Sequence, residues 1–282
     1  MNLIFGMIRM GVVAFLLLCA FFLVAVGHVT TIRREGIRLA NWLIIPIVWA
    51  AARVFRITML CPEPDRLRTH QGLLLANHQS YLDILLTNAF YPVRYLAAIE
   101  VRQRPVLGWL SEAVGSVFIE RGDIKSGRSV KGQLAEALKS DPQPPIVIFP
   151  EGRLGDGYTL FNFRRGTFRI AAENEIPYLL CAIKYDKPEI TTWHGRHGES
   201  MIQAVWRLAT YGKPIRAELI PLETIYPKSS QHAQTLAVQA RSIIAEGLGI
   251  EKEKVKKMKI SPQSTVKSPR SISEVTDFGP RT

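Results

Sequence analysis

The N-terminus carries the feature that most restricts where this chain can fold. From Leu3 to Gly27 the only charged residue is Arg9, and as a helix this run would be roughly 37 Å long, at about 1.5 Å per residue. Such a helix is long enough to cross the apolar core of a bilayer. Arg9 lies near its start, where the long side chain lets the guanidinium reach the lipid head groups. We therefore expect a membrane anchor here.

The residues that follow indicate how the anchor is oriented. Arg33, Arg34 and Arg38 come directly after it, and the positive-inside rule places them, with the rest of the chain, in the cytoplasm. A second apolar stretch, Leu39 to Phe55, is shorter than the roughly 20 residues needed to cross, so we expect it to lie in the membrane interface or to re-enter. A cleaved signal peptide is the alternative, but the first run is long for one and a second apolar stretch follows.

The net charge and the cysteine content limit which binding partners, disulfides and metal sites we expect. The formal net charge is +12, which favours a polyanionic partner, either nucleic acid or an anionic lipid surface. The apolar N-terminus and the lack of any helix-turn-helix, zinc-finger or aromatic-basic RNA motif favour a lipid membrane, and we expect no nucleic acid partner. The cysteines, Cys19, Cys61 and Cys181, have neither paired spacing nor histidines at zinc spacing, so we expect no disulfide framework and no metal site.

Between residues 59 and 250 short apolar segments alternate with helical patterns, which is typical of βαβ units and of a sheet covered on both faces. The expected strands are Gly72–Ala76, Arg94–Ala98, Ser116–Ile119, Ile146–Phe149, Tyr178–Tyr185 and Ile215–Ile220, and the expected helices are Tyr81–Phe90, Val106–Val114, Ser126–Lys139, Arg165–Glu173, Met201–Thr210 and Gln231–Gly247. We therefore divide the chain into membrane-anchoring helices over 1–58, an α/β domain over 59–250, and a basic tail over 251–282 whose composition predicts disorder.

The most informative motif is the Asn-His-x4-Asp run over residues 77–83. Ser80 followed three residues later by Asp83 is a capping box, so a helix should begin at Tyr81. His78 then lies on the turn between strand and helix, where the Asp83 carboxylate can fold back to its imidazole. A carboxylate bonded to one ring nitrogen fixes the tautomer and leaves the other nitrogen as a base, which typically contributes about 10²–10⁴-fold to a rate.

Further runs follow this motif in a particular order. They are Gly115–Arg121, Phe149–Arg153, residues 163–168 (Phe-Arg-Arg-Gly-Thr-Phe) and the Ile-Pro pair at 176–177. In order and spacing, the set resembles the four sequence blocks of the glycerolipid acyltransferase family, the lysophosphatidate acyltransferases and their relatives. The first block matches Asn-His-x4-Asp, the second usually ends Ile-Asp-Arg, and the third usually reads Phe-Pro-Glu-Gly-Thr-Arg. The resemblance covers about residues 72–185.

The resemblance implies a mixed, largely parallel sheet flanked by helices, preceded by a membrane-binding helical segment. It also implies transfer of a fatty acyl group from acyl-CoA or acyl carrier protein to the sn-2 hydroxyl of a lysophospholipid, in the first instance 1-acyl-sn-glycerol-3-phosphate, without a covalent enzyme intermediate. The family's roles fall on His78 as general base, Asp83 as its orienting partner, Asn77, Glu151 and Gly152 at the acceptor, and Arg121 and Arg153 as phosphate ligands. Beyond the thioester, no cofactor or metal is implied.

The chain departs from the family pattern at several positions, two of which lie beside the predicted phosphate ligands. Glu120 stands where Asp is usual, and the Thr after Glu-Gly is missing, so Arg153 comes one position early. Other acceptor head groups (choline, ethanolamine or ornithine) therefore stay open, as does a CoA-independent transacylase. Two further classes compete. A Ser-His-Asp hydrolase using Ser80 would lack the usual G-x-S-x-G elbow, and a non-enzymatic membrane scaffold would not depend on His78.

Overall fold

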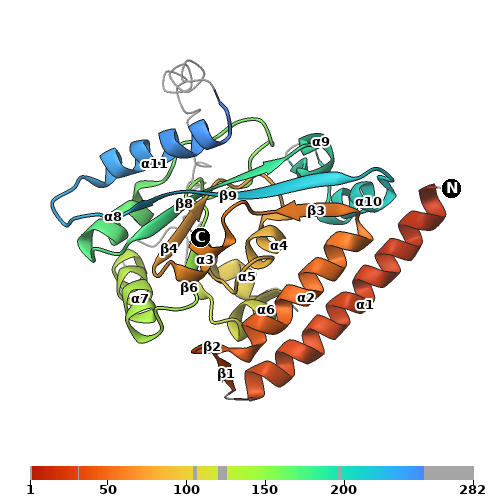
Figure 1. The fold of residues 1–282 in the computed structure, drawn as a ribbon, viewed down its shortest axis with the longest axis horizontal. Helices are drawn as coiled ribbons and strands as arrows, with labels where there is room; N and C mark the ends of the chain where they lie inside the picture. Colours follow the sequence, from red (N-terminus) through yellow and green to blue (C-terminus); the bar gives the residue numbers. More distant parts are fainter. Residues whose placement is uncertain (1, 31, 104–106, 120–125, 196–197, 251–282) are drawn as a thin grey trace, which may run out of the picture.

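The computed structural model describes residues 2–30, 32–103, 107–119, 126–195 and 198–250. A seven-stranded sheet lies at the centre of this part of the chain, with helices on both faces (Figure 1). The sheet is mixed and mostly parallel, so the predicted fold class is confirmed. The predicted tail over 251–282 lies outside the described residues.

The strand order determines which loops meet at the site. The order is β3-β9-β8-β4-β7-β5-β6, and the only antiparallel neighbours in it are β8 and β9. The bounds are β3 (Ile57–Leu60), β4 (Leu73–Ala76), β5 (Arg94–Ala98), β6 (Val117–Ile119), β7 (Ile146–Ile148), β8 (Tyr178–Tyr185) and β9 (Ile215–Ile225). β4, the middle strand, is buried throughout, because helices cover both of its faces, and β4 therefore lacks apolar–polar alternation.

The helices form two layers, each with its own apolar core. One face is covered by α2 (Leu39–Val54), α3 (Pro64–Thr69), α4 (Asp83–Asn88) and α10 (Met201–Thr210), and the other by α7 (Ser126–Ser140), α8 (Arg165–Glu173) and α11 (Ala233–Gly247). Side chains of β4 alternate between the two cores: Leu74 faces the first, whereas Leu73 and Leu75 face the second. The central strand thereby ties the layers together.

Several predicted bounds match the structure, and others differ for identifiable reasons. β5, β8, α8 and α10 have the bounds expected from the sequence. β9 continues to Ile225 instead of ending at Ile220. β3 pairs only with residues 215–218 of β9, so Pro221 lies where one edge of β9 is unpaired and its missing N–H breaks no ladder there. The short elements β1 (Arg33–Arg34), β2 (Ile37–Arg38), β3, α3, α5 (Ile99–Arg102) and α9 (Pro188–Thr191) were not predicted.

The N-terminal helix α1 (Asn2–Val29) lies against the domain beside α2 (Figure 1). Near its start, a Cβ added to Gly6 would be only 2.8 Å from Thr210 Cγ2 of α10. Arg9 donates from Nη1 to the carbonyl oxygens of Ala209 (2.8 Å) and Tyr211 (3.2 Å). The expectation that Arg9 reaches the lipid head groups is thus wrong. It caps the end of α10, where the last carbonyls lack helical partners and the helix dipole favours a cation.

The second apolar stretch forms α2, which also packs on the domain. α2 packs between α1 and the sheet, and its residues Val48 and Ala52 belong to the buried core. Core packing therefore accounts for the buried side chains of α2, whereas its place in the membrane interface stays a prediction. α6 (Leu107–Ala113) supports α1 further along, where the Phe21 and Trp109 rings lie 4.6 Å apart.

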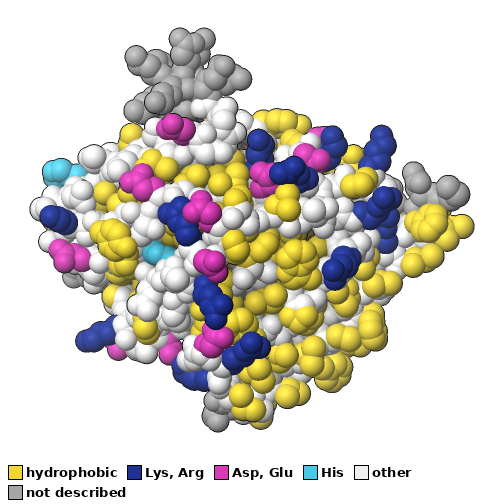
Figure 2. Space-filling model, in the orientation of Figure 1, with side chains coloured by type: hydrophobic (Ala, Val, Ile, Leu, Met, Phe, Trp, Pro, Cys, Tyr) yellow, Lys and Arg dark blue, Asp and Glu magenta, His cyan; other side chains and the backbone are white. Residues whose placement is uncertain are grey.

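The outer face of α1 is apolar. The side chains of Leu3, Ile4, Ile8, Phe15, Leu18 and Phe22 are each more than half exposed. Figure 2 shows hydrophobic side chains gathered over the region where α1 and α2 lie in Figure 1. α1 is long and apolar enough to cross a membrane by length and composition, but its inner face is held by α2, α6 and α10. This geometry leaves one long apolar face of α1 available for contact with a membrane.

Candidate active site

The site begins where β4 leaves the sheet. Asn77 directly follows β4 and is fully buried. Its Nδ2 donates to the Ile183 carbonyl (2.9 Å), and its Oδ1 accepts from the Ile183 N–H (2.7 Å). The side-chain amide thus replaces a backbone pair and fastens the end of β4 to β8. Asn77 was expected at the acceptor, but in the structure it stabilises the strand end.

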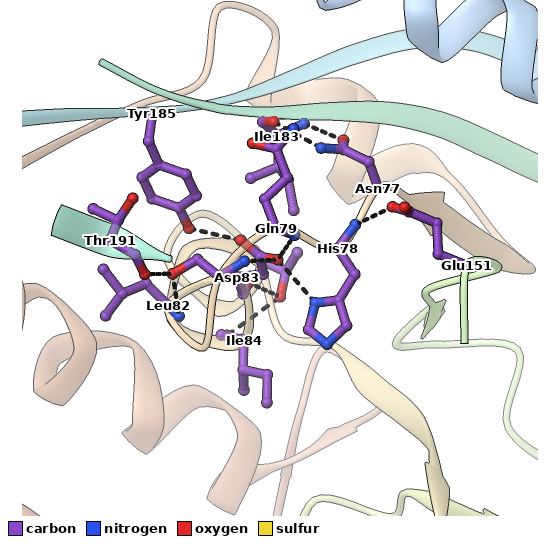
Figure 3. A network of polar contacts seen from close by, with 12 residues as sticks. Asn77, His78, Gln79, Leu82, Asp83, Ile84, Glu151, Ile183, Tyr185 and Thr191 are labelled. Atoms are coloured by element: carbon purple, nitrogen blue, oxygen red, sulfur yellow. Dashed lines mark hydrogen bonds and ion pairs between the residues drawn. The ribbon is translucent and has the colours of Figure 1, made fainter. Parts of the chain in front are cut away.

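His78 and Asp83 lie together, as the motif predicted (Figure 3). The His78 Nδ1 is 2.8 Å from Asp83 Oδ2, and because a carboxylate only accepts, Nδ1 carries a proton; in the neutral imidazole Nε2 then keeps its lone pair. Within the described residues, Nε2 has no hydrogen-bond partner. The ring stacks on Phe149 with centroids 4.1 Å apart, and the His78 side chain is 17% exposed. The imidazole is thus oriented by protein on one side and accessible on the other.

Asp83 fixes the whole turn. Its Oδ2 also accepts from the backbone N–H groups of Gln79 (2.8 Å) and Ser80 (2.9 Å). This differs from the predicted capping box, because the Ser80 hydroxyl accepts from the Leu82 N–H and α4 begins at Asp83 instead of Tyr81. Residues 81–82 form a turn instead. Wrapping the chain around the carboxylate delays the helix and keeps His78 outside it.

The arrangement disfavours the serine hydrolase alternative. Ser80 is fully buried, and its hydroxyl donates to the Thr191 carbonyl while accepting from the Leu82 N–H. A nucleophilic serine would direct its hydroxyl to the free nitrogen of the base. Ser80 instead holds the turn against the last residue of α9.

Glu151 lies level with His78, in the turn that follows the neighbouring strand β7. β4 and β7 pair in parallel with Leu75 opposite Ile148. Three residues beyond this pair, the two segments reach His78 and Glu151. Glu151 Oε1 accepts from the His78 N–H (2.7 Å) and Oε2 from the Phe161 N–H (2.9 Å). Burial raises the pKa of Glu151 to about 7, although both N–H groups favour the carboxylate. Glu151 was expected to contact the glycerol, but the structure uses both of its oxygens to position the loop that carries His78.

Glycines allow close approach beside Glu151. Gly152 has a φ of 66°, and a Cβ there would lie 2.5 Å from Arg164 Nε. The missing side chain therefore lets the Arg164 guanidinium lie across the backbone. Gly155 donates its N–H to the His78 carbonyl (2.7 Å), so the loop after β7 holds His78 from both sides of its peptide.

Two arginines flank the same loop. The exposed Arg153 has its guanidinium carbon 3.7 Å from the centre of the Phe161 ring. Arg164 is also exposed; its backbone N–H donates to the Pro150 carbonyl (2.8 Å), but its guanidinium has no hydrogen bond or ion pair within the described residues. A guanidinium without a carboxylate partner is suited to an anionic ligand. Arg121, the other predicted phosphate ligand, lies outside the described residues, as does Glu120.

Two residues close to the site had no assigned role in the sequence. Arg164 is part of the Phe-Arg-Arg-Gly-Thr-Phe run, but its approach to Gly152 depends on how the loop before α8 folds. Tyr185 gave no motif signal, yet its hydroxyl donates to Asp83 Oδ1 (2.8 Å). The signal that could have found Tyr185 is its position at the carboxyl end of a predicted strand.

Comparison with known proteins agrees with this geometry. Residues 59–184 match the family model described as Acyltransferase, so the segment that carries the site is an acyltransferase-family domain and the family prediction is confirmed. A lyso-ornithine lipid O-acyltransferase of Pseudomonas aeruginosa is 33% identical over 159 residues, which cover 56% of this chain and 57% of that protein. A 1-acyl-sn-glycerol-3-phosphate acyltransferase of Neisseria meningitidis is 26% identical over 183 residues, covering 63% of this chain and 71% of that protein.

A solved structure supports the fold. The crystal structure of PlsC, the 1-acyl-sn-glycerophosphate acyltransferase of Thermotoga maritima, superposes with a TM-score of 0.64 at 17% identity and covers 89% of this chain and 97% of that one. At this identity the likeness concerns the fold. The alignment with the Pseudomonas relative spans little more than half of that protein, so the reaction and the substrate are treated below as proposals.

Proposed function

We propose that this protein transfers a fatty acyl group from an acyl thioester to the sn-2 hydroxyl of a lysophospholipid. The observation that carries the proposal is the His78 imidazole, oriented by Asp83 through Nδ1 at 2.8 Å and left with a free Nε2 at the carboxyl end of β4. Ligands of α/β sheets bind at this edge. The acyltransferase-family match over residues 59–184 supports the same reaction class.

In the proposed reaction the chemistry needs one base and no covalent enzyme intermediate. His78 Nε2 takes the proton of the acceptor hydroxyl as its oxygen attacks the thioester carbonyl carbon. The carbon–sulfur bond then breaks, and the leaving thiolate receives the proton from the His78 imidazolium. The Asp83 carboxylate stabilises that imidazolium. The donor is acyl-CoA or acyl carrier protein, and no metal or further cofactor takes part.

The acceptor of the proposal carries an anionic head group. Arg153 directly follows Gly152, and the Arg164 guanidinium lies close to Gly152. Both are next to the loop that holds His78, and a guanidinium fork fits phosphate or carboxylate oxygens. We take 1-acyl-sn-glycerol-3-phosphate as the first candidate, with phosphatidic acid as the product. Lyso-ornithine lipid, which carries a carboxylate, is the second candidate, because the Pseudomonas relative of that name is 33% identical.

The lipid acceptor also explains the N-terminus. An apolar outer face of α1 and a domain packed on its inner face suit a protein lying on a bilayer, with the acceptor drawn from that membrane. We propose that the domain lies on the cytoplasmic side, as the arginines after α1 predicted. Arg33 is less informative for this purpose than it was in the sequence, because it pairs with Asp141 at 2.7 Å.

The test offers purified protein in vesicles a panel of lysophospholipids and labelled acyl-CoA or acyl carrier protein. We expect labelled diacyl product from wild type and none above background from His78→Ala. Product formed without any thioester would favour a transacylase. Unchanged membrane binding with no acyl transfer to any acceptor would favour the scaffold alternative.

A further inference from the structure

We propose that Tyr185 is a positioning residue for the His78–Asp83 pair, acting through the second oxygen of the Asp83 carboxylate. The inference rests on the proposed reaction and extends it to a side chain outside the four sequence blocks. Nothing in the motif pattern draws attention to Tyr185.

The placement follows from the strand order. β8 is the neighbour of β4 and runs parallel to it, with Ala76 opposite Cys181. Tyr185, the last residue of β8, therefore lies at the same sheet edge as the loop that follows β4. Its hydroxyl donates to Asp83 Oδ1 at 2.8 Å (Figure 3). Tyr185 is 6% exposed and Asp83 is 0% exposed, so water does not replace this contact readily.

The two carboxylate oxygens have separate tasks. Oδ2 accepts from His78 Nδ1 and from the Gln79 and Ser80 N–H groups. Oδ1 is bonded by Tyr185, its only hydrogen-bond donor in the described part of the chain. A donor on each oxygen fixes the rotation of the carboxylate, which keeps Oδ2 aimed at the imidazole. It also stabilises the buried negative charge, since a charged group without partners is costly to bury.

The tyrosine remains a donor at every relevant pH. Its pKa is held well above the ordinary value by burial and by the neighbouring Asp83 charge. The other titratable groups near the pair are Glu151 after β7, Tyr95 of β5 and Tyr81 on the turn after Ser80. Glu151 bonds the backbone N–H groups of His78 and Phe161, so removing the Tyr185 hydroxyl leaves its contacts in place.

The test compares Tyr185→Phe with Tyr178→Phe in full-length protein. Tyr178 is a matched control, because it lies in the same strand, is 1% exposed and belongs to the opposite core cluster. Without the Tyr185 hydroxyl the Asp83 carboxylate becomes a stronger acceptor, and it stabilises the protonated His78 imidazolium more. We expect kcat/KM with lysophosphatidate and acyl-CoA to fall about 10-fold or more, and its acid limb to move to higher pH. Tyr178→Phe should change neither.

A double variant shows whether the effect passes through Asp83. Adding Tyr185→Phe to Asp83→Asn should cost less than about 2-fold, whereas independent effects would multiply. An unmoved acid limb, a loss that only follows a lower folded fraction, or full multiplication with Asp83→Asn would overturn the inference while leaving the proposed reaction intact. If wild type acylates no lysophospholipid, the proposed function fails first, and the inference fails with it.

Discussion

The loop that carries His78 and the arginines beside Gly152 lie at the same end of the sheet, yet their side chains are held very differently. Asp83 accepts from four donors and Glu151 from two backbone N–H groups, all in a buried setting. Arg153 touches an aromatic ring and Arg164 crosses a glycine, and both are exposed. In the proposed reaction the His78 base is therefore preorganised, whereas the rim, meaning the exposed Arg153 and Arg164 that would meet the acceptor, is adjustable.

This contrast offers a physical reason why relatives with different named acceptors both resemble this chain. In the proposed reaction, a base held by hydrogen bonds and accessible at Nε2 works on any hydroxyl brought to it, so the chemistry is independent of the head group. Exposed arginines can be repositioned or replaced at little cost to the fold. Selectivity for the acceptor head group can therefore change through these arginines while the His78–Asp83 pair stays the same.

The largest effect is expected at the base. His78→Ala should lower kcat by about 10²–10⁴-fold, because it removes the group that accepts the hydroxyl proton. Membrane binding should not change. His194→Ala is the matched control, since His194 lies in a polar loop where its N–H bonds Glu199. Activity within a few-fold of wild type in His78→Ala would contradict a general-base role and remove the distinction between the two regions.

The buried carboxyl group of Glu151 should make the stability of the protein depend on pH. Its folded-state pKa of about 7 lies above the ordinary 4.5, so the native state binds a proton that the unfolded chain releases. The free energy of unfolding should therefore fall by roughly 3 kcal/mol as pH rises through about 7. Glu151→Gln should abolish this slope. It should also lower activity, because an amide NH₂ would face the N–H of His78 or Phe161.

Denaturation in detergent at several pH values measures the slope. Glu136→Gln, on the exposed face of α7, serves as the control and should keep the wild-type pH dependence. A wild-type unfolding energy that rises between pH 5 and 8 would mean that the two N–H groups outweigh burial at Glu151.

At the rim, Arg153→Ala should lower kcat/KM for the acceptor by about 10- to 150-fold. This range corresponds to the loss of a hydrogen bond to a charged group, which contributes roughly 1.5–3 kcal/mol. The KM for the thioester should change little, and Lys should restore only part, because it supplies a point charge. Arg164→Ala and Arg121→Ala are measured alongside, with Arg165→Ala as the control, since Arg165 lines a cavity with α11. Loss confined to Arg121→Ala would move the anion site to that residue.

The smallest effect is expected from Gly152→Ala. The new methyl group would displace the Arg164 guanidinium, 2.5 Å away at Nε, and the positive φ adds strain of about 1 kcal/mol. We expect a several-fold rise in the acceptor KM and a small fall in melting temperature, with kcat nearly unchanged. A kcat that falls as far as in His78→Ala would show that the rim and the base are one rigid unit.

Local patterns in the sequence were sufficient to predict part of the fold and part of the candidate site. The His78–Asp83 pair was predicted because its members are five residues apart on one strand-turn-helix, so short-range geometry alone brings them together. β5, β8, α8 and α10 were likewise predicted from apolar runs and periodicity. The start of α4 was not, because the Asp83 carboxylate competes with the helix for the N–H groups of the turn.

Strand order decided the rest. Placing β4 between β8 and β7 brings Tyr185 to one side of the His78 loop and Glu151 to the other. The same packing sends Arg9 to the end of α10 instead of the lipid. These contacts join residues about 70 to 200 positions apart, and no local pattern records them. The sequence by itself thus determined the reacting pair and the fold class, while only the tertiary structure determined what supports that pair, since long-range partners depend on which strands and helices become neighbours.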